Sequence, residues 1–274
     1  MAAVAFAVVL CVAGGVVAEP AGASRQADRV LPRDPFDSAA MRRFLGGRSG
    51  NITAAVYDVA SRRTFLLRPG VREYTASIAK VEILAALLAR TQREGGLSTA
   101  QRQLAAAMIE ESDNDAAQLL FEEVGGLPTL DALDARLRMT QTTQNWSWGL
   151  IETTPRDQLR LLRAIVLRKR FLSRASRRYA LDLLEHVDPA QAWGVSSGPG
   201  AGVTVALKNG WDPTAGIWQV NSIGMIRGHG RRYLLAVMTS QPGYAYGVQT
   251  IEGISQIVWH ELRRRRRVPL ATVG

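Results

Sequence analysis

The chain has 274 residues, of which 47% are hydrophobic and 21% are charged, with 25 glycines and 11 prolines. This ordinary globular composition excludes a collagen-like chain, a wholly disordered chain and a small disulfide-stapled domain. The length predicts one or two domains with a sizeable core. An excess of 34 basic over 24 acidic residues gives a net charge of +10, which raises the question of nucleic-acid binding.

The basic residues are divided very unevenly between the two cations. Only Lys80, Lys169 and Lys208 are lysines, and the other 31 are arginines. Arginine is therefore the ordinary surface cation of this chain. A position that keeps lysine is a candidate for chemistry that needs an amine, because a buried ammonium can lose its proton whereas a guanidinium effectively cannot.

The N-terminal region predicts export. Residues 2–18 form a run of small apolar side chains, and an A-x-A cleavage pattern ends at Ala23. We therefore expect residues 1–23 to be a signal peptide and the protein to be secreted or extracytoplasmic, with a retained N-terminal membrane anchor as the alternative. The single cysteine, Cys11, lies inside this run, so cleavage would leave no thiol.

Beyond a linker and a short helix within residues 24–50, the expected elements fall into three blocks. Residues 51–60 and 63–68 are rich in β-formers and predict a hairpin. Helical periodicity then predicts six helices, over residues 77–93, 98–111, 114–124, 128–137, 155–167 and 173–186. After a Gly/Ser/Pro loop, strands are expected over residues 203–207, 216–226 and 232–238, followed by a helix over 248–262.

This order of elements predicts an α/β fold of the α+β kind. Strands, a block of helices, then strands and a closing helix suit an antiparallel sheet flanked by terminal helices, with an all-helical lobe inserted. We expect one domain over residues 51–262. Its sheet lobe would comprise residues 51–73 and 200–262, and its helical lobe residues 74–199. An arginine-rich tail, residues 263–274, follows.

A Ser-x-x-Lys pattern opens the first helix of the helical block. Ser77 and Lys80 are three residues apart, so on a helix their side chains share one face. The amine can then take the hydroxyl proton and activate a nucleophile, and the N–H groups of the helix start can stabilise an oxyanion. The alternative is a capping serine followed by a solvated lysine, against which the scarcity of lysine argues.

Two further patterns carry polar groups at breaks between elements. Ser112-Asp113-Asn114 stands at the junction of two predicted helices, where a hydroxyl and an amide can shuttle a proton and hold a substrate amide. The competing interpretation is that Ser112 or Asn114 caps the next helix. Lys208-Asn209-Gly210-Trp211 stands at the end of a predicted strand, where an ammonium can meet a carboxylate; an ordinary turn is the alternative.

The three patterns, in this order, resemble the S-x-x-K, S-D-N and K-T-G signature of class A β-lactamases and penicillin-binding proteins. The resemblance covers roughly residues 51–262. It implies a β-lactamase-like fold in which Ser77 is the acylated nucleophile and Lys80 is its base. Ser112 would pass a proton to the leaving nitrogen.

The same resemblance implies a substrate-binding set. Asn114 would orient Lys80 or the substrate amide. Lys208, Asn209 and Gly210 would line the side that receives a substrate carboxylate, although Asn209 lacks the hydroxyl that the family places there. The backbone N–H of Trp211 would complete an oxyanion hole with that of Ser77.

A second departure from the family concerns deacylation. Class A enzymes carry an E-x-x-L-N loop whose Glu activates the deacylating water. Residues 140–152 read TQTTQNWSWGLIE and contain no such motif, and Glu152 aligns with the end of the loop. An acyl-enzyme is therefore expected to form and to persist.

Other patterns do not compete with this interpretation. A G-x-S-x-G match at residues 194–198 lies in a loop before a strand, not in the strand-turn-helix that a nucleophile elbow needs. His186, His229 and His260 have no metal-ligand spacing, so neither a metal nor another cofactor is expected.

The expected function is that of an exported serine hydrolase that forms an acyl-enzyme at Ser77 with a β-lactam or a peptidoglycan-peptide-like substrate. The alternative is a catalytically weak or inactive protein of the same fold that binds or senses wall peptides. We expect a monomer without nucleic-acid partners. The five arginines at 263–267 suit a solvated helix end, or adhesion to an anionic wall or membrane surface.

Overall fold

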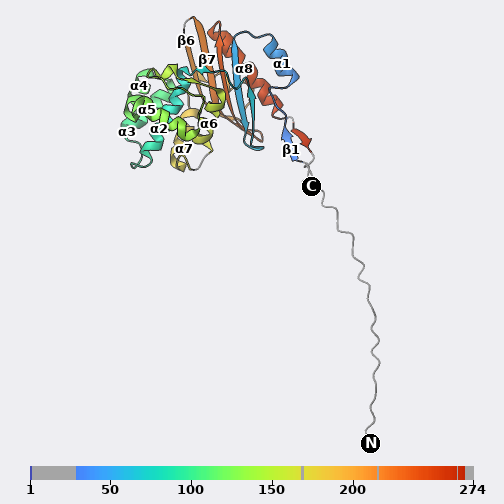
Figure 1. Ribbon diagram of the computed structural model, residues 1–274, viewed down its shortest axis with the longest axis horizontal. Coiled ribbons are helices and arrows are strands. Elements are labelled where there is room, and N and C mark those ends of the chain that lie inside the picture. The colour runs from blue at the N-terminus through green and yellow to red at the C-terminus, as the bar shows by residue number, and fades with distance from the viewer. Residues whose placement is uncertain (2–28, 168–169, 215, 264, 269–274) are drawn as a thin grey trace. The chain divides into compact units, whose positions relative to one another are not determined.

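A computed structural model describes residues 1, 29–167, 170–214, 216–263 and 265–268 (Figure 1). Its contacts divide the chain into two units. One unit comprises Met1–Val30 and Arg267–Gly274, and most of it lies outside the described residues, as do Cys11 and the rest of the expected signal peptide after Met1. The other unit, Leu31–Arg266, holds the elements that build the site. Lys169 also lies outside the described residues.

A five-stranded antiparallel sheet is the centre of this unit. Its strand order is β3-β2-β8-β7-β6, so β6 is an edge strand. The bounds are β2 Asn51–Asp58, β3 Arg63–Leu67, β6 Thr204–Thr214, β7 Ile217–Gly228 and β8 Arg231–Gln241. The predicted hairpin of residues 51–68 is β2 paired with β3, and the antiparallel sheet with an all-helical block is confirmed.

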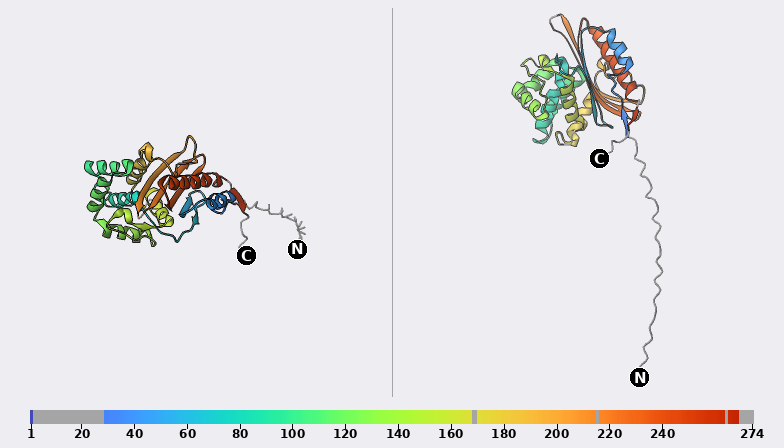
Figure 2. Two further views of the ribbon diagram at one scale, coloured as in Figure 1. Left: turned by 90° about the horizontal axis from the view of Figure 1, so that it is seen from above. Right: turned by 45° about the vertical axis from the view of Figure 1, so that its right-hand side comes forward.

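Helices cover both faces of the sheet (Figures 1 and 2). On one face lie α1 (Ala39–Gly46) and α8 (Tyr244–Glu261), the terminal helices. On the other lies the helical block, with α2 Lys80–Thr91, α3 Thr99–Ala106, α4 Asn114–Val124, α5 Gly126–Leu137, α6 Pro155–Val166 and α7 Arg174–Glu185. Pro155 occupies the first turn of α6, where its missing N–H costs little.

The central strands β2, β7 and β8 are buried on both faces because each face packs on its own apolar core. Successive side chains of a strand point to opposite faces. Ala54 and Val56 accordingly join the core under α1 and α8, whereas Ala55 and Tyr57 join the core under the helical block. The sequence of a central strand that is covered by helices on both sides is therefore a nearly continuous apolar run.

Several elements differ from the sequence-based expectation. The strand expected to end at residue 207 continues to Thr214, so Lys208-Asn209-Gly210-Trp211 lies inside β6 rather than at its end. The hairpin with β7 extends it, because each residue from Thr204 to Thr214 has a partner across the ladder. The final helix begins at Tyr244 instead of residue 248. A short sheet of β4 (Glu73–Tyr74) and β5 (Glu152–Thr153) was not expected.

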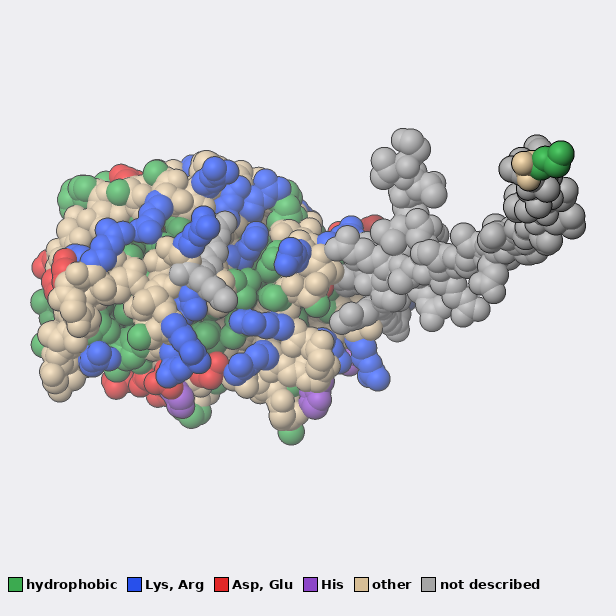
Figure 3. Space-filling view, turned by 90° about the horizontal axis from the view of Figure 1, so that it is seen from below, with side chains coloured by type: hydrophobic (Ala, Val, Ile, Leu, Met, Phe, Trp, Pro, Cys, Tyr) green, Lys and Arg blue, Asp and Glu red, His purple; other side chains and the backbone are tan. Residues whose placement is uncertain are grey.

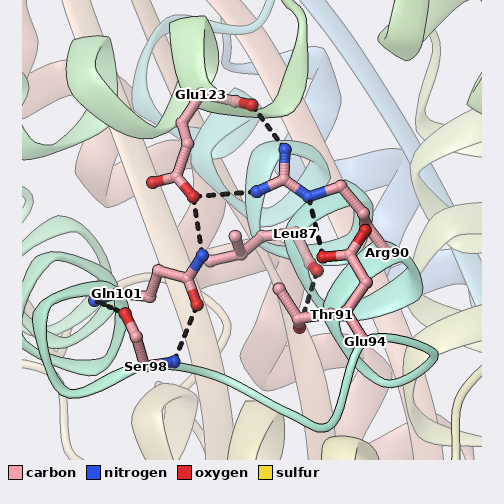
Figure 4. Close-up of polar contacts among 7 residues, drawn as sticks. All are labelled: Leu87, Arg90, Thr91, Glu94, Ser98, Gln101 and Glu123. Carbon is pink, nitrogen blue, oxygen red and sulfur yellow. Dashed lines mark hydrogen bonds and ion pairs between the residues drawn. The ribbon is translucent and has the colours of Figure 1, made fainter.

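A polar network joins α2, α3 and α4 at a distance from Lys80 and Asn114. The carboxylate of Glu123, on α4, accepts from Arg90 of α2 at 2.8 Å and from Gln101 of α3 at 2.6 Å (Figure 4). Gln101 also completes a capping box with Ser98, the N-cap of α3. The network therefore holds α2 and α4, whose other ends carry Lys80 and Asn114, in one arrangement.

The two cation types occupy different environments. Every arginine whose exposure the structure describes is at least partly exposed, and basic side chains are spread over the face in Figure 3. The two described lysines are the opposite case, because Lys80 and Lys208 are 0% and 1% exposed. Among the residues whose exposure is described, lysine thus occupies buried positions and arginine occupies exposed or partly exposed ones.

The C-terminal arginines only partly form the expected tail. Arg265–Val268 is strand β9, which pairs with β1 (Arg29–Pro32) in a separate two-stranded sheet. Residues 264 and 269–274 lie outside the described residues. A search of the described helices finds none with the length and apolarity of a membrane span.

Candidate active site

The Ser77 turn lies between the sheet and α2. Ser77 is half-buried in a 3-10 turn, η1 (Ala76–Ala79), that runs directly into α2, and Lys80 is the first residue of that helix. Ala76 has a φ of 46°, in the left-handed region that non-glycine residues rarely adopt. Such a backbone costs free energy of order 1–3 kcal/mol and persists only where neighbouring contacts enforce it.

Two segments supply those contacts. Asn221, fully buried on β7, donates its Nδ2 to the carbonyls of Tyr74 at 2.8 Å and Thr75 at 3.0 Å. Thr75 donates its backbone N–H to the carbonyl of Ile151 at 2.8 Å. Its hydroxyl donates to the carbonyl of Trp148 at 3.2 Å. The sheet and the loop of residues 140–152 therefore clamp the turn that presents Ser77.

Asn221 and Thr75 were not expected at the site from the sequence. A signal for Asn221 exists, because it is a polar residue in the middle of the apolar strand β7 and lies opposite Gly210 in the ladder. A signal for Thr75 is lacking, since its partners come from a loop more than seventy residues away in the chain.

Gly210 allows the edge strand β6 to approach the Ser77 turn. A Cβ at this position would lie 2.7 Å from the backbone nitrogens of Ser77 and Ile78 and 2.8 Å from the carbonyl oxygen of Thr75. These are backbone atoms, so the contact cannot be relieved by a side-chain rotation. The space that a side chain would fill at Gly210 is thus occupied by the backbone of the Ser77 turn.

The Ser-Asp-Asn motif divides its roles between capping and the site. Asp113 caps α4, because its carboxylate accepts from the N–H of Ala116 at 2.6 Å. The capping by Ser112 or Asn114 that we considered does not occur. Ser112 ends the π-turn η2 (Ala107–Glu111) with a φ of 61°. This left-handed backbone lies at the break before α4. Ser112 and Asn114 are consequently available to Lys80.

Lys80 is held by the Ser-Asp-Asn motif. Its Nζ donates to the carbonyl of Ser112 at 2.6 Å, to the hydroxyl of Ser112 at 3.1 Å and to Oδ1 of Asn114 at 2.7 Å. Burial lowers the pKa of Lys80 to about 8, with Asp113 acting in the opposite direction. The indole ring of Trp148 lies 5.0 Å from Nζ and closes the site on the loop side.

The second lysine approaches the same hydroxyl. Lys208 Nζ donates to Oγ of Ser112 at 2.9 Å and to the carbonyl of Asn209 at 3.1 Å. Burial, and then the charge of Lys80, lower the pKa of Lys208 to about 7. The hydroxyl of Ser112 thus accepts from two amines, which directs its own proton away from both.

Asn209 does not share the site with its neighbours. It is 1% exposed, and its Nδ2 donates to the carbonyls of Gln191 at 2.7 Å and Trp193 at 3.1 Å. Successive residues of a strand face opposite ways, so Asn209 and Trp211 point away from the face that carries Lys208 and Gly210. Asn209 therefore fixes the loop before β6, and the side chain that we expected at a substrate holds backbone instead.

The loop of residues 140–152 contributes no carboxylate to Lys80. Glu152 pairs with Thr143 through both backbone groups, and its side chain lies 3.6 Å from Arg72. Gln144 anchors the loop on two buried acids, because its Nε2 donates to Glu82 and to Asp134 at 2.7 Å each. Burial raises the pKa of both acids, that of Asp134 to about 6.

The comparisons with known proteins agree with this geometry. Residues 91–262 match the model of a family described as "Beta-lactamase enzyme family", and the chain belongs to that family. The matched region contains Ser112, Asn114 and Lys208 and begins downstream of Lys80. No curated protein matches the sequence.

Solved β-lactamase structures share the fold. A β-lactamase from Chitinophaga pinensis is 19% identical, with a TM-score of 0.72, over 80% of this chain and 96% of that chain. A class A representative from Bacteroides cellulosilyticus is 18% identical, with a TM-score of 0.73, over 84% and 99%. An ancestral class A β-lactamase is 25% identical, with a TM-score of 0.70, over 80% and 97%.

Gly210→Ala is expected to reduce acylation of Ser77 by at least tenfold, because the new Cβ displaces the Ser77 backbone and a misplacement of about 1 Å can cost a hundredfold in rate. The measurement is the rate of covalent labelling by a penicillin. Gly70→Ala is the control, since a Cβ at Gly70 meets nothing within 4 Å. Unchanged labelling of Gly210→Ala would contradict the argument.

Lys208→Met is expected to stabilise the fold at pH 6 by about 1–3 kcal/mol, because a lysine with a lowered pKa costs stability, partly offset by its hydrogen bonds. The cost is complete below pH 7 and fades as the pH rises from 7 towards the unfolded value near 10.4. In thermal unfolding, the stability difference between Lys208→Met and the unchanged protein should therefore be smaller at pH 9 than at pH 6. A difference that grows with pH would refute this.

Proposed function

We propose that this protein is an exported serine hydrolase of the β-lactamase and penicillin-binding type, which forms an acyl-enzyme at Ser77 with a β-lactam or a related amide or ester. The observation that carries the proposal is the pair of buried lysines on the hydroxyl of Ser112, with Lys80 one helical turn from Ser77. A purely structural role would not require two buried amines with lowered pKa values.

The proposed acylation needs only groups on this site. Ser77 Oγ attacks the carbonyl carbon while its proton passes to a neutral Lys80. The negative oxygen of the tetrahedral intermediate is stabilised by the backbone N–H groups of Ser77 and Trp211, on the turn and on the edge strand that meets it. The carbon–nitrogen bond then breaks, and Ser112 gives its proton to the leaving nitrogen as it receives one from Lys80.

Asn114 and Lys208 have supporting roles in this proposal. Asn114 accepts from Lys80 and thereby fixes the direction of the amine. Lys208 holds the hydroxyl of Ser112 in the orientation that faces the leaving group. Protonated Lys208 also stabilises a negative charge that arrives with the substrate, and it loses this role above pH 7 as it becomes neutral.

Slow deacylation is part of the proposal. Hydrolysis of the ester requires a water molecule and a base that takes its proton. The indole of Trp148 occupies the loop side of Lys80, and Glu152 is committed to Thr143 and Arg72. One solved structural neighbour, 22% identical, is described as an acyl-enzyme complex of a penicillin-binding protein variant with penicillin G.

The second candidate is a wall-peptide binding or sensor protein of weak catalytic activity. The locked side chain of Asn209 favours it, because the hydroxyl that the family uses for a substrate carboxylate is missing. Acylation of Ser77 discriminates between the two functions.

Incubation with benzylpenicillin is expected to add one equivalent of the intact drug to the protein, and the adduct should accumulate for minutes or longer. Intact-mass spectrometry measures it, and peptide mapping should place it on Ser77. Ser77→Ala should remain unlabelled, whereas Ser196→Ala, in the unrelated G-x-S-x-G match, should label as the unchanged protein does. Rapid turnover without an adduct would contradict slow deacylation, and no reaction at all would contradict the function.

The rate of acylation by a neutral ester is expected to rise by roughly 10–50-fold from pH 6 to pH 8 and then to level off. Only the neutral amine accepts the proton of Ser77, and the pKa of Lys80 is about 8. Lys80→Arg should abolish the rise, because a guanidinium keeps its proton. A flat profile in the unchanged protein would exclude Lys80 as the base.

A further inference from the structure

The proposed acylation leaves two buried acids unused. Glu82, on α2, is 0% exposed, and Asp134, on α5, is 6% exposed. Each accepts from Nε2 of Gln144 at 2.7 Å. Among the residues that the structure describes, neither acid has an ion-pair partner, and Glu82 Oε2 and Asp134 Oδ1 accept from no N–H or hydroxyl group. A buried acid without a cation costs stability, so the retention of two such acids indicates a role.

The contact between the two acids requires a proton. Glu82 and Asp134 lie close enough to form a hydrogen bond with each other. Two carboxyl groups make such a bond only if one of them is protonated, because a carboxylate is an acceptor alone. The other charged groups that act on the pair are also acids, Asp131 of α5 and Asp157 of α6, and Asp157 has its own cation in Arg160 at 2.7 Å. The surroundings therefore favour the form of the pair that carries a proton.

Gln144 connects this pair to the loop side of the catalytic amine. It is the first residue after the backbone bridge that closes the loop, and Trp148, four residues further on, places its ring 5.0 Å from Lys80 Nζ. Thr75 holds the backbone carbonyl of Trp148 at 3.2 Å. The ring itself donates only to Gln118, at 3.2 Å, and that bond is exposed to water, where a hydrogen bond stabilises little. Gln144 is therefore the buried side-chain anchor of the segment that carries the ring.

We propose that Glu82, Asp134 and Gln144 form a proton-dependent anchor for this loop. While the two acids share a proton, Gln144 stays docked and Trp148 stays beside Lys80. Loss of that proton leaves two carboxylates together in a buried site without a cation, so the loop opens and water reaches the amine. The three residues are positioning residues, because they act on the reaction through Trp148. The opening is independent of the proposed function, whereas its effect on an acyl-enzyme rests on that function.

The burial of the acids sets the direction of the pH dependence. Burial is the main cause that raises the pKa of both, that of Asp134 to about 6 and that of Glu82 well above its ordinary value. The closed loop thus binds protons more tightly than the open loop, so closure is favoured at low pH and weakens as the pH rises above about 6. Lys80, with a pKa of about 8, becomes neutral as the pH rises further. The open loop then exposes an ester to both water and a base.

Fluorine NMR of the protein labelled with 5-fluorotryptophan tests the anchor directly. Trp148→Phe identifies the Trp148 signal by its loss, and the solvent isotope shift of that signal measures the exposure of the ring to water. In the unchanged protein we expect this shift to increase from pH 6 to pH 9 and to approach that of free 5-fluorotryptophan. Gln144→Met lacks the donor and should show the exposed value at both pH values.

Matched variants assign the change to the acid pair. Glu82→Gln keeps the size of the side chain but has no carboxyl proton to lose, so its Trp148 signal should stay buried from pH 6 to pH 9. The double variant Glu82→Gln/Asp134→Asn should behave in the same way. Asp131→Asn makes the same change of charge at an exposed position of α5 and should respond as the unchanged protein does. A response that survives in Glu82→Gln, or no response in the unchanged protein, would overturn the anchor.

The lifetime of the benzylpenicillin adduct at pH 8 tests the consequence for the reaction. Gln144→Met, with an open loop, should lose the adduct about tenfold faster than Glu82→Gln, with a closed loop, because access of water to a base accelerates hydrolysis at least that much. The two variants should acylate at similar rates. Equal lifetimes would overturn the effect on the reaction. Absence of any adduct would overturn the proposed function, and the fluorine signals would still decide the anchor.

Discussion

The arrangement of the site depends on two buried lysines that share one hydroxyl. Lys80 and Lys208 come from opposite parts of the fold, the first from the helical block and the second from the edge strand, and both donate to Oγ of Ser112. Burial lowers the pKa of Lys80 to about 8, and burial together with the charge of Lys80 lowers the pKa of Lys208 to about 7. The chain thus keeps a costly charge pair where a base is useful.

The rest of the structure holds this pair in place. Strain is stored at Ala76 and Ser112, the residues at which the chain turns into the site, and both have positive φ values. Asn221 holds the first turn from the sheet, and Asp113 caps the helix after the second. Polar contacts between α2, α3 and α4 fix the far ends of the same helices (Figure 4). Each strained position is therefore adjacent to hydrogen bonds that hold the chain in place.

The loop of residues 140–152 separates this chain from the class A pattern. It is anchored on the buried acids Glu82 and Asp134 through Gln144, and it presents the ring of Trp148 to Lys80. The indole N–H of Trp148 donates to Gln118 at 3.2 Å, and an indole has no group that accepts a proton from water, which is the physical basis of the persistent acyl-enzyme that we propose.

The sequence by itself determined the sheet with its helical block, the position of most helices and the three motifs, because periodicity, caps and glycine stops act over a few residues. It also predicted that lysines here have a chemical role, which their burial supports. Only the tertiary structure decided that Asp113 caps α4, that Asn209 turns away from the site, and that Gly210 meets the Ser77 turn. Those outcomes depend on contacts between residues far apart in the chain, and no local pattern encodes such contacts.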